Sequence, residues 1–245
     1  MLINLRNGMM GGKRTPPAKD YVQSGLVAMW DGIENAGWGV HNPNATEWKD
    51  LTGNGYDMTI HAGSTIGDDY IANATQWVAG IGASKSIPFT ACEAVFLFRE
   101  GKTFMVCIGL ASDRNNYTYI QANGATRIGV SQRGYNTNNY AGFDAPESIV
   151  GTRCSVSVNY SFGRYFGAKE VYLNSDPVTI AFGNVYPYNN AGNAFAVGGR
   201  YQSGTNPSTL QTGANVCNIR LYSRTLTAEE IEHNYKIDKE RFNLL

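Results

Sequence analysis

The sequence predicts an all-β fold with two antiparallel sheets, and three observations carry that prediction. Short apolar or alternating runs recur between about residues 24 and 222, and clusters of Gly, Asn, Asp and Ser separate them. Gly (28 residues) and Tyr (15 residues) are abundant, and these residues favour turns and strands respectively. A clear helical pattern occurs near the carboxyl end. We therefore expect a β-sandwich or barrel of about a dozen strands, followed by one helix.

Length and charge narrow the class of protein. The chain has 245 residues, a formal net charge of zero and 16% charged residues. This length suits one large β domain or two small ones, and the composition does not shift after residue 24. We expect a single domain over residues 24–245. A neutral chain is not built to neutralise nucleic-acid phosphates, and no apolar run is long enough for a transmembrane helix.

Residues 1–23 are predicted to be a flexible leader with a small cationic cluster (Arg6, Lys13 and Arg14). The leader has no continuous apolar segment of the kind that secretory signals need. We therefore expect synthesis in the cytoplasm. A bacterial cell-surface protein whose signal was removed is the alternative.

The expected strands follow in order along the chain. They occupy residues 26–30, 56–60, 94–98, 103–110, 117–121, 127–131, 153–160, 170–174, 178–182, 194–199 and 215–222. Two of these runs alternate cleanly, which places one set of side chains on each face of a strand. The expected inward sets are Cys154, Val156, Val158 and Tyr160 in the first, and Cys217, Ile219 and Leu221 in the second. Ser175, Asp176 and Pro177 indicate a short hairpin connection.

The terminal helix is predicted over about residues 228–241 from its start signals. Thr227 can cap the helix, with Glu230 as its reciprocal partner three residues later. Leu226 and Ile231 are spaced for a hydrophobic staple. Ile231, Tyr235 and Phe242 fall on roughly one face, so we expect this face to pack on the sandwich.

The four cysteines, Cys92, Cys107, Cys154 and Cys217, are too far apart in sequence for a Cys-x-x-Cys site. Each lies within or beside an apolar or alternating run. Four buried free thiols are the favoured interpretation, and one or two disulfides are the alternative.

The segment NIRLYSRTLTAEEIEHNY (218–235) resembles the closing strand and helix of laminin G-like, concanavalin A-like jelly rolls. That family often carries the pattern R-[IL]-Y-x-R-x-L-[ST]-x-x-E-[IL]. The matching residues are Arg220, Leu221, Tyr222, Arg224, Leu226, Thr227, Glu230 and Ile231. Three earlier segments, GLVAMWDG (25–32) with WKDLTGNG (48–55), EVYLNSDPV (170–178) and AFAVGGR (194–200), resemble family segments in the same order.

The resemblance spans about residues 25–240 and implies a two-sheet jelly roll. One departure is clear, because many relatives carry an acidic residue just before the closing strand, where this chain has Val216-Cys217-Asn218. Any ligand or metal role of that acid is therefore not carried over. The Met-, Gly- and Lys-containing leader is similar to leaders in proteins of gut bacteria and their phages.

Catalytic motifs of this fold are not found in the sequence. Laminarinase-type hydrolases carry E-x-D-x-x-E on a strand, and this pattern does not occur here. The acidic cluster Glu229, Glu230 and Glu232 falls on the predicted helix, where it suits the amino-terminal end. The three histidines are widely separated, and no G-x-S-x-G occurs. We expect no enzymatic activity, with a glycoside hydrolase as the less favoured alternative.

Calcium is the candidate cofactor, since related jelly rolls often bind it through oxygen ligands. The loop at residues 50–57 offers Asp50, Asn54 and Asp57 as a metal site. The alternative is that Asp50 and Asn54 form Asx turns, with Gly53 and Gly55 at positive φ. Asp68 and Asp69 are a weaker acidic pair.

Glycan binding is the leading functional hypothesis, because sugars stack on aromatic rings and hydrogen-bond to amides. Three loops combine these residue types. The candidate ligand-binding residues are Tyr135, Asn136 and Tyr140, then Tyr186, Tyr188 and Asn189, then Tyr201. Trp48 is expected in the core rather than in a binding platform.

The sequence therefore predicts a lectin-like, non-catalytic adhesion module that binds a glycan or a bacterial surface polysaccharide. The missing signal and the leader favour a phage virion protein, with other virion proteins as partners. A structural virion protein without a glycan site is the alternative.

Overall fold

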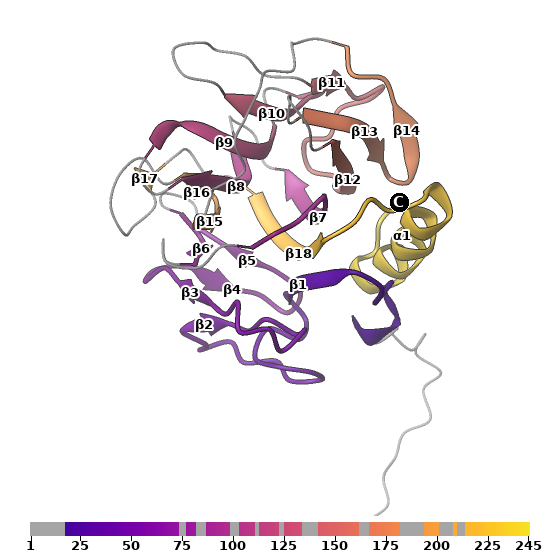
Figure 1. Ribbon diagram of the computed structural model, residues 1–245. Helices are drawn as coiled ribbons and strands as arrows, with labels where there is room; N and C mark the ends of the chain where they lie inside the picture. Colours follow the sequence, from indigo (N-terminus) through magenta and orange to yellow (C-terminus); the bar gives the residue numbers. More distant parts are fainter. Residues whose placement is uncertain are drawn as a thin grey trace, which may run out of the picture.

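The computed structural model describes residues 18–73, 77–81, 87–98, 103–110, 113–122, 125–133, 142–161, 167–181, 194–200, 208–209 and 214–245. Within these ranges, the backbone alone is described at 103–110, 113–119, 121–122, 131–133, 161, 167, 194, 199–200, 208–209 and 214. The strands form two eight-stranded antiparallel sheets, and the helix α1 (Ala228–Phe242) lies at the carboxyl end (Figure 1). The prediction of an all-β sandwich with a terminal helix is confirmed.

The first sheet, called sheet I below, carries α1 on its outer face. Its order is β14 (Asp176–Val178), β13 (Gly167–Leu173), β12 (Arg153–Ser161), β7 (Ala91–Phe98), β18 (Ala214–Tyr222), β5 (Ile71–Ala72) and β4 (Thr65–Ile66), and β1 (Leu26–Asp31) also pairs with β18. Strands distant in sequence thus lie side by side, since β18 pairs with both β1 and β7. Such long-range pairing is typical of a jelly roll.

The second sheet, called sheet II, faces sheet I across the core. Its order is β11 (Gly142–Asp144), β10 (Arg127–Arg133), β9 (Asp113–Ala122), β8 (Thr103–Leu110), β15 (Ala194–Val197), β6 (Ala79–Gly80), β3 (Met58–Ile60) and β2 (Glu47–Trp48). A separate pair is made by β16 (Gly199–Arg200) and β17 (Ser208–Thr209).

Aromatic and branched side chains from both sheets fill the core. Trp30 of sheet I stacks on Phe195 of sheet II, with ring centroids 5.1 Å apart. Trp48 is fully buried, as expected, and its indole N–H donates to the Asp31 carbonyl at 2.9 Å. The indole N–H of Trp30 likewise donates to the Tyr56 carbonyl. Both indoles therefore contribute apolar area without leaving a buried donor unpaired.

The alternation predicted for β12 is confirmed, because its four inward residues all belong to the core between the sheets. The prediction for β18 is wrong at one position. A bulge between Val216 and Asn218 shifts the register, so Val216 joins the core, and Cys217 packs instead against Phe242 of α1. An extra residue in a bulge reverses the alternation locally, and the sequence pattern does not mark it.

The β13–β14 hairpin is tighter than the sequence predicted. Asn174 and Ser175 alone form the turn, with φ of 51° and 67°, while Asp176 and Pro177 belong to β14. Two consecutive left-handed residues match the twist of a two-residue hairpin, and Asn tolerates this conformation well. Of the predicted strand at 178–182, only Val178 is in β14, and residue 182 lies outside the described residues.

The folded domain begins earlier than predicted. The short helix η1 (Ala18–Asp20) and Tyr21 fall in the expected leader, yet Ala18 is fully buried and Tyr21 is 2% exposed. The backbone N–H of Val22 donates to the Asn234 side chain of α1. Figure 1 shows this indigo segment running beside α1. Residues 18–23 therefore belong to the domain, because they help to cover the interface between α1 and sheet I.

Local sequence signals start α1 as predicted. Thr227 accepts a hydrogen bond from the Glu230 N–H at 3.3 Å, and the Glu230 carboxylate accepts one from the Thr227 N–H at 3.0 Å. Arg224 also binds both oxygens of Glu230, which lowers the pKa of that carboxyl. Leu226 and Ile231 pack in one cluster, so the hydrophobic staple is confirmed as well.

The buried face of α1 is more polar than predicted. Ile231 and Phe242 are buried, but Tyr235 is only partly buried. The remaining buried residues of the helix are Asn234, Ile237, Asp238 and Arg241. Three of these four are polar or charged, so α1 docks through hydrogen bonds and ion pairs in addition to apolar contacts.

A network of buried charges joins α1 to sheet I. Arg220 of β18 binds Glu93 of β7 at 2.9 Å and binds Asp238 of α1 through both oxygens at 2.7 Å. All three side chains are at most 1% exposed. Tyr21 completes this part of the network, since its ring lies 4.0 Å from the Arg220 guanidinium and its hydroxyl donates to Asp238.

A second part of the network surrounds Arg241. Its guanidinium binds Asp31 of β1 at 2.8 Å and Glu34 at 3.3 Å. Burial raises the pKa of the Asp31 and Glu93 carboxyls above their usual range, although the neighbouring arginines act in the opposite direction. Four carboxylates and two guanidinium groups thus meet beneath the helix, and each must find partners there because water is excluded.

Three cysteines, Cys92, Cys154 and Cys217, are buried and free, in agreement with the favoured interpretation. The side chain of Cys107 lies outside the described residues. Burial raises the pKa of the three described thiols, so they are poor nucleophiles in the native state. Among the described residues, no helix combines the length and the apolar character needed to span a membrane.

Candidate functional site

All seven tyrosine and asparagine residues predicted to bind a glycan lie outside the described residues. Tyr135, Asn136 and Tyr140 fall in the segment 134–141, whereas Tyr186, Tyr188 and Asn189 fall in 182–193. Tyr201 falls in 201–207. The residues that flank these segments are described, and their positions relate the three segments to sheet II.

The described residues that flank two of these segments, Arg133 and Ala194, lie at the same end of sheet II. Arg133, which precedes residue 134, pairs with Tyr117; Tyr117 pairs with Gly109, and Gly109 pairs with Ala194, which follows residue 193. Neighbouring strands are spaced about 4.8 Å apart, so Arg133 and Ala194 lie roughly 14 Å apart across the sheet. Val197 pairs with Ala79 at the opposite end of β15, and the chain continues from there towards Tyr201.

The register also defines the outer face of sheet II. Ile120, Ile128 and Val130 are at most 1% exposed and belong to the core. Because successive positions in a strand alternate between faces, the positions between these residues lie on the outer face. On β9 and β10 these positions are Tyr117, Tyr119 and Gln121, paired with Arg133, Ser131 and Gly129.

One register row crosses seven of the eight strands of sheet II on this outer face, from β10 to β2. It runs through Ser131, Tyr119, Cys107, Ala196, Gly80, Thr59 and Glu47. Ala196 and Gly80, in the middle of the row, are small and buried, whereas Thr59 and Glu47 at one end are polar and exposed. Tyrosine, serine, glutamine and arginine are residue types that recognise sugars by stacking and hydrogen bonding.

This face was missed by sequence reasoning, although a signal was present. The run Tyr117-Thr118-Tyr119-Ile120-Gln121 alternates, which places both tyrosines and the glutamine on one side of the strand. The alternating run was interpreted only as a strand. The pairing of that side with Ser131 and Arg133 requires the register, which the sequence does not contain.

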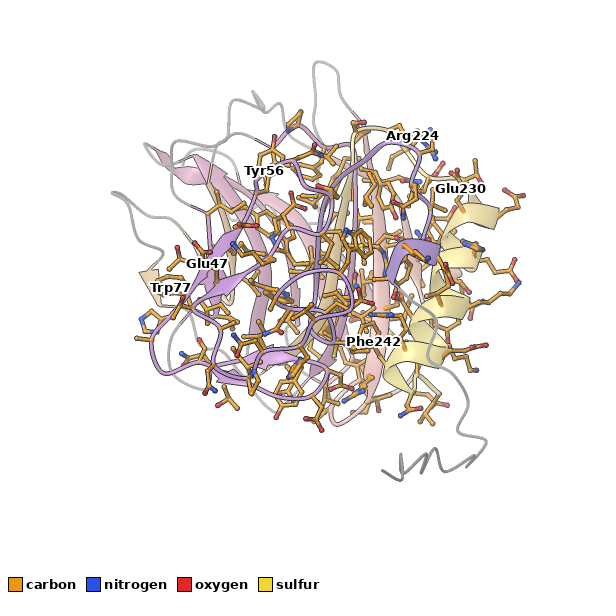
Figure 2. All side chains as sticks on the ribbon, turned by 90° about the horizontal axis from the view of Figure 1, so that it is seen from below. Glu47, Tyr56, Trp77, Arg224, Glu230 and Phe242 are labelled. Carbon is orange, nitrogen blue, oxygen red and sulfur yellow. The ribbon has the colours of Figure 1, made fainter. Side chains whose placement is uncertain are left out.

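An aromatic pair lies at the edge of sheet II. The rings of His61 and Trp77 meet edge to face, with centroids 4.7 Å apart, and the His61 N–H donates to the Val78 carbonyl at 2.9 Å. Nδ1 of His61 is buried and has no hydrogen-bond partner. Figure 2 shows Trp77 and Glu47 at one side of the molecule and α1 at the other. Trp77 is therefore remote from the helix.

The loop at residues 50–57, predicted as a metal site, covers the free edge of β1. The Asp50 carboxylate accepts the Met29 N–H at 3.1 Å, and the Leu51 N–H donates to the Met29 carbonyl at 2.8 Å. Thr52 and Asn54 both donate to the Val27 carbonyl. Exposed strand edges invite unwanted pairing, so this loop completes the hydrogen bonds of the edge strand.

The donor set around Asp50 does not fit a calcium ion well. Besides Met29, its two carboxylate oxygens accept hydrogen bonds from the backbone and hydroxyl of Thr52 and from the Tyr56 N–H. Asp57 accepts the Asp50 N–H and binds Lys49, and the Asn54 side chain donates its N–H group. The Asx turn at Asp50 is present, as are the positive φ values of Gly53 and Gly55.

Two other acidic candidates, Asp69 and Glu232, have structural partners in the described part of the chain. Asp69 binds Arg153, and Glu232 binds Lys236. Among the described residues, no group of three or more His, Cys, Asp or Glu side chains is arranged to hold a metal ion. Four carboxylates meet in the buried network beneath α1, and Glu47 and Asp57 share Lys49 at the surface.

No model of a known protein family matches the chain, and no curated protein matches it. Solved structures do resemble it. A sialidase from Trypanosoma rangeli, in a covalent intermediate with 2,3-difluorosialic acid, superposes with a TM-score of 0.62 at 15% identity. The match covers 97% of this chain but 36% of the sialidase, so the chain spans about a third of that enzyme's length.

A smaller structure matches along almost its whole length. The CBM40 module of the IT-sialidase from Ruminococcus gnavus, solved with α2,3-sialyllactose, has a TM-score of 0.52 at 11% identity. That match covers 68% of this chain and 96% of the module, and the same module with α2,6-sialyllactose gives a TM-score of 0.51. These similarities establish the β-sandwich fold, which agrees with the expected concanavalin A-like jelly roll.

Proposed function

We propose that this protein is a non-catalytic carbohydrate-binding module, with sialylated glycans as its first candidate ligands. One observation carries the proposal: the chain contains a β-sandwich that matches nearly the whole of a module solved with sialyllactose bound. Because a module of that size binds a glycan without a catalytic domain around it, the shared architecture is sufficient for binding alone. Fold by itself does not determine function, so the chemistry of the outer face of sheet II must also be suitable.

The residue types at that face support the proposal. The backbone register places Tyr117, Tyr119 and Gln121 opposite Arg133, Ser131 and Gly129, and these residue types include aromatic, hydrogen-bonding and cationic groups. Sialic acid carries a carboxylate, for which arginine is a well-suited partner. Arg133 and Ala194, which flank two of the predicted glycan-binding segments in the sequence, lie at the same end of the sheet.

The buried carboxylates support binding rather than catalysis. Glycoside hydrolases commonly place two carboxyl groups on either side of the scissile bond, within reach of substrate. Glu93 and Asp238 are at most 1% exposed, and both bind Arg220. Asp31 and Glu34 are similarly buried and bind Arg241. These two carboxylate pairs hold the helix in place and lie on the opposite side of sheet I from the core.

Isothermal titration calorimetry with α2,3-sialyllactose, α2,6-sialyllactose and lactose tests the proposal, together with an array of bacterial polysaccharides. We expect at least one sialylated or bacterial glycan to bind. Tyr119→Ala should lower the association constant at least about tenfold, equivalent to about 1.4 kcal/mol, because it removes a stacking ring. Incubation with each sialyllactose should release no free sialic acid.

The matched control is Tyr172→Ala, which removes a partly buried tyrosine from sheet I. It should leave glycan affinity unchanged. The proposal fails if no glycan on the array binds, or if the Tyr119 variant binds as tightly as the wild type. Release of sialic acid would show that the protein is a glycoside hydrolase and not a non-catalytic module.

The predicted origin and location extend this proposal. A phage virion protein with this module would be made in the cytoplasm and would meet cell-surface polysaccharides after lysis. Mass spectrometry of purified virions tests this extension, since the protein must be present in them.

A further inference from the structure

We infer that the turn around Trp38 is a separate binding site for an uncharged pyranose ring, which stacks on the Trp38 indole. The inference rests on the proposed function only in taking a glycan as ligand. Trp38 lies in the segment between β1 and β2, outside the ladders that define the outer face of sheet II. The site is therefore additional to the one proposed on that face.

Trp38 and its neighbour Val40 are unusual for their exposure. Trp38 is 47% exposed and Val40 is 50% exposed, and the other large exposed hydrophobic side chain in the described residues is the terminal Leu245. Trp30 and Trp48, by contrast, are fully buried. A single exposed hydrophobic residue is ordinary. Two occur within this one turn, and the exposed Trp38 indole offers a small apolar platform.

The turn is held in one conformation by its own backbone. The Ala36 N–H donates to the Val40 carbonyl at 3.1 Å, and the Val40 N–H donates to the Gly37 carbonyl at 2.9 Å. Gly37 and Gly39 have φ of 135° and 68°, values that other residues rarely adopt. An added Cβ at either glycine would meet no other atom within 4 Å. These glycines therefore serve the shape of the turn, and the space beside Trp38 is open.

Buried side chains anchor the turn to the domain. The Glu34 carboxylate accepts the Gly39 N–H at 2.9 Å and binds Arg241 of α1. The fully buried Asn35 both donates to the Asn42 carbonyl and accepts the Asn42 N–H, each at 2.8 Å. A platform fixed in this way loses little conformational entropy when a ligand binds, which favours affinity from a small contact area.

The residues of the turn favour an uncharged sugar over a charged ligand or a protein partner. Residues 37–46 contain no Lys, Arg, Asp or Glu, and exposed His41, Asn42 and Asn44 follow Val40. Amide and imidazole groups suit sugar hydroxyls, and one indole matches the apolar face of one pyranose ring. A stable protein interface needs about 800 Å² from each partner, far more than two apolar side chains provide. The turn thus favours a saccharide over a protein.

The test follows the indole ¹⁵N–¹H resonances of the four tryptophans during titration with lactose, maltose, cellobiose and N-acetyllactosamine. Trp38→Phe assigns the Trp38 resonance. We expect a saturable shift of that resonance with at least one of the four sugars. The Trp30 and Trp48 resonances should not move, because their N–H groups already donate to buried carbonyls. Trp38→Ala should lower the association constant for that sugar at least about tenfold.

Trp77→Ala is the matched control, since it removes the partly buried tryptophan beside His61, and it should leave the affinity for the neutral sugar unchanged. If sialyllactose binds while none of the four sugars shifts Trp38, the inference fails and the proposed function stands. If no saccharide binds in either assay, both fail. Concentration-dependent dimerisation of the wild type that Trp38→Ala abolishes would overturn the inference and make the turn a self-association surface.

Discussion

The outer face of sheet I and the outer face of sheet II both carry rows of polar residues, but α1 covers only the row on sheet I. In sheet I, the row through Ser157, Glu93 and Arg220 lies beneath α1 and is buried. In sheet II, the row passes through Ser131, Tyr119 and Ala196, while α1 lies on the other side of the molecule (Figure 2). Polar residues on an outer face therefore do not by themselves indicate a solvent-facing or ligand-binding surface.

The charges beneath α1 form a complete set of ion pairs between carboxylates and guanidinium groups. The register of sheet I brings Glu93 and Arg220 together as direct neighbours. Burying such groups costs desolvation free energy, which the ion pairs and hydrogen bonds offset only when they are complete. The network thus fixes where the helix sits. Sheet II places tyrosines and small residues at its outer register positions.

Breaking the network should give the largest loss of stability. Arg220→Met removes the cation that Glu93 and Asp238 share, and it leaves two buried carboxylates without their charged partner. We expect the free energy of unfolding to fall by about 3–5 kcal/mol, measured by urea denaturation.

The control applies the same substitution on sheet II. Arg127 binds Asp144 in an ion pair whose side chains are 43% and 48% exposed. Solvent screens such a pair, so Arg127→Met should cost less than about 1 kcal/mol. Equal losses in the two variants would contradict the comparison between the two faces.

Removing the Asp50 carboxylate should have the next largest effect. Asp50→Ala leaves the N–H groups of Met29, Thr52 and Tyr56 without their acceptor at the edge of β1. We expect a loss of about 1–3 kcal/mol, because unsatisfied donors keep their desolvation cost.

The same measurement separates an edge-capping role from the predicted calcium site. If Asp50 serves the loop and β1, the melting temperature should be the same with calcium and with a chelator. A stabilisation by calcium that Asp50→Ala abolishes would instead establish the metal site formed by Asp50, Asn54 and Asp57.

The sequence predicts the local features of the fold and of the candidate sites better than it predicts the long-range contacts. Thr227 and Glu230 predicted the start of α1 correctly, since a capping box is formed within four residues. The alternation in β12 likewise identified its core face. In contrast, the pairing of Arg220 with Glu93 joins residues 127 positions apart, and the sequence holds no local signal for it. Asp50 illustrates another limit, because an edge-capping carboxylate and a metal ligand have the same sequence appearance.

Titration of the buried carboxyls beneath α1 should change the free energy of unfolding by less than the substitutions above. Burial raises the pKa values of Asp31 and Glu93, so the native state retains their protons to higher pH than the unfolded chain does. In that pH window the native state binds more protons, and the contribution of these groups to the free energy of unfolding falls as pH rises. The window starts at the ordinary carboxyl pKa values, about pH 4, and extends upward.

Glu93→Gln tests this dependence, because glutamine cannot titrate. Urea denaturation between about pH 5 and pH 8 should show a steeper loss of stability with rising pH in the wild type than in the variant. Identical slopes, or a wild type that gains more stability than the variant as pH rises, would show that Glu93 does not titrate as proposed.

The smallest expected effect on stability comes from replacing a serine by alanine. The same substitution can be made on the outer face of each sheet, so it compares the two faces directly. Ser157 donates to the Glu93 carboxylate at 2.9 Å and is 4% exposed, so Ser157→Ala should cost about 1–2 kcal/mol. Ser131 occupies the equivalent kind of position on sheet II, and Ser131→Ala should change stability by less than about 0.5 kcal/mol. If sheet II is the recognition face, Ser131→Ala should nevertheless lower glycan affinity, whereas Ser157→Ala should not. A Ser131 variant that loses stability as the Ser157 variant does would mean that both outer faces are structural, and the glycan site would then have to lie elsewhere on the domain.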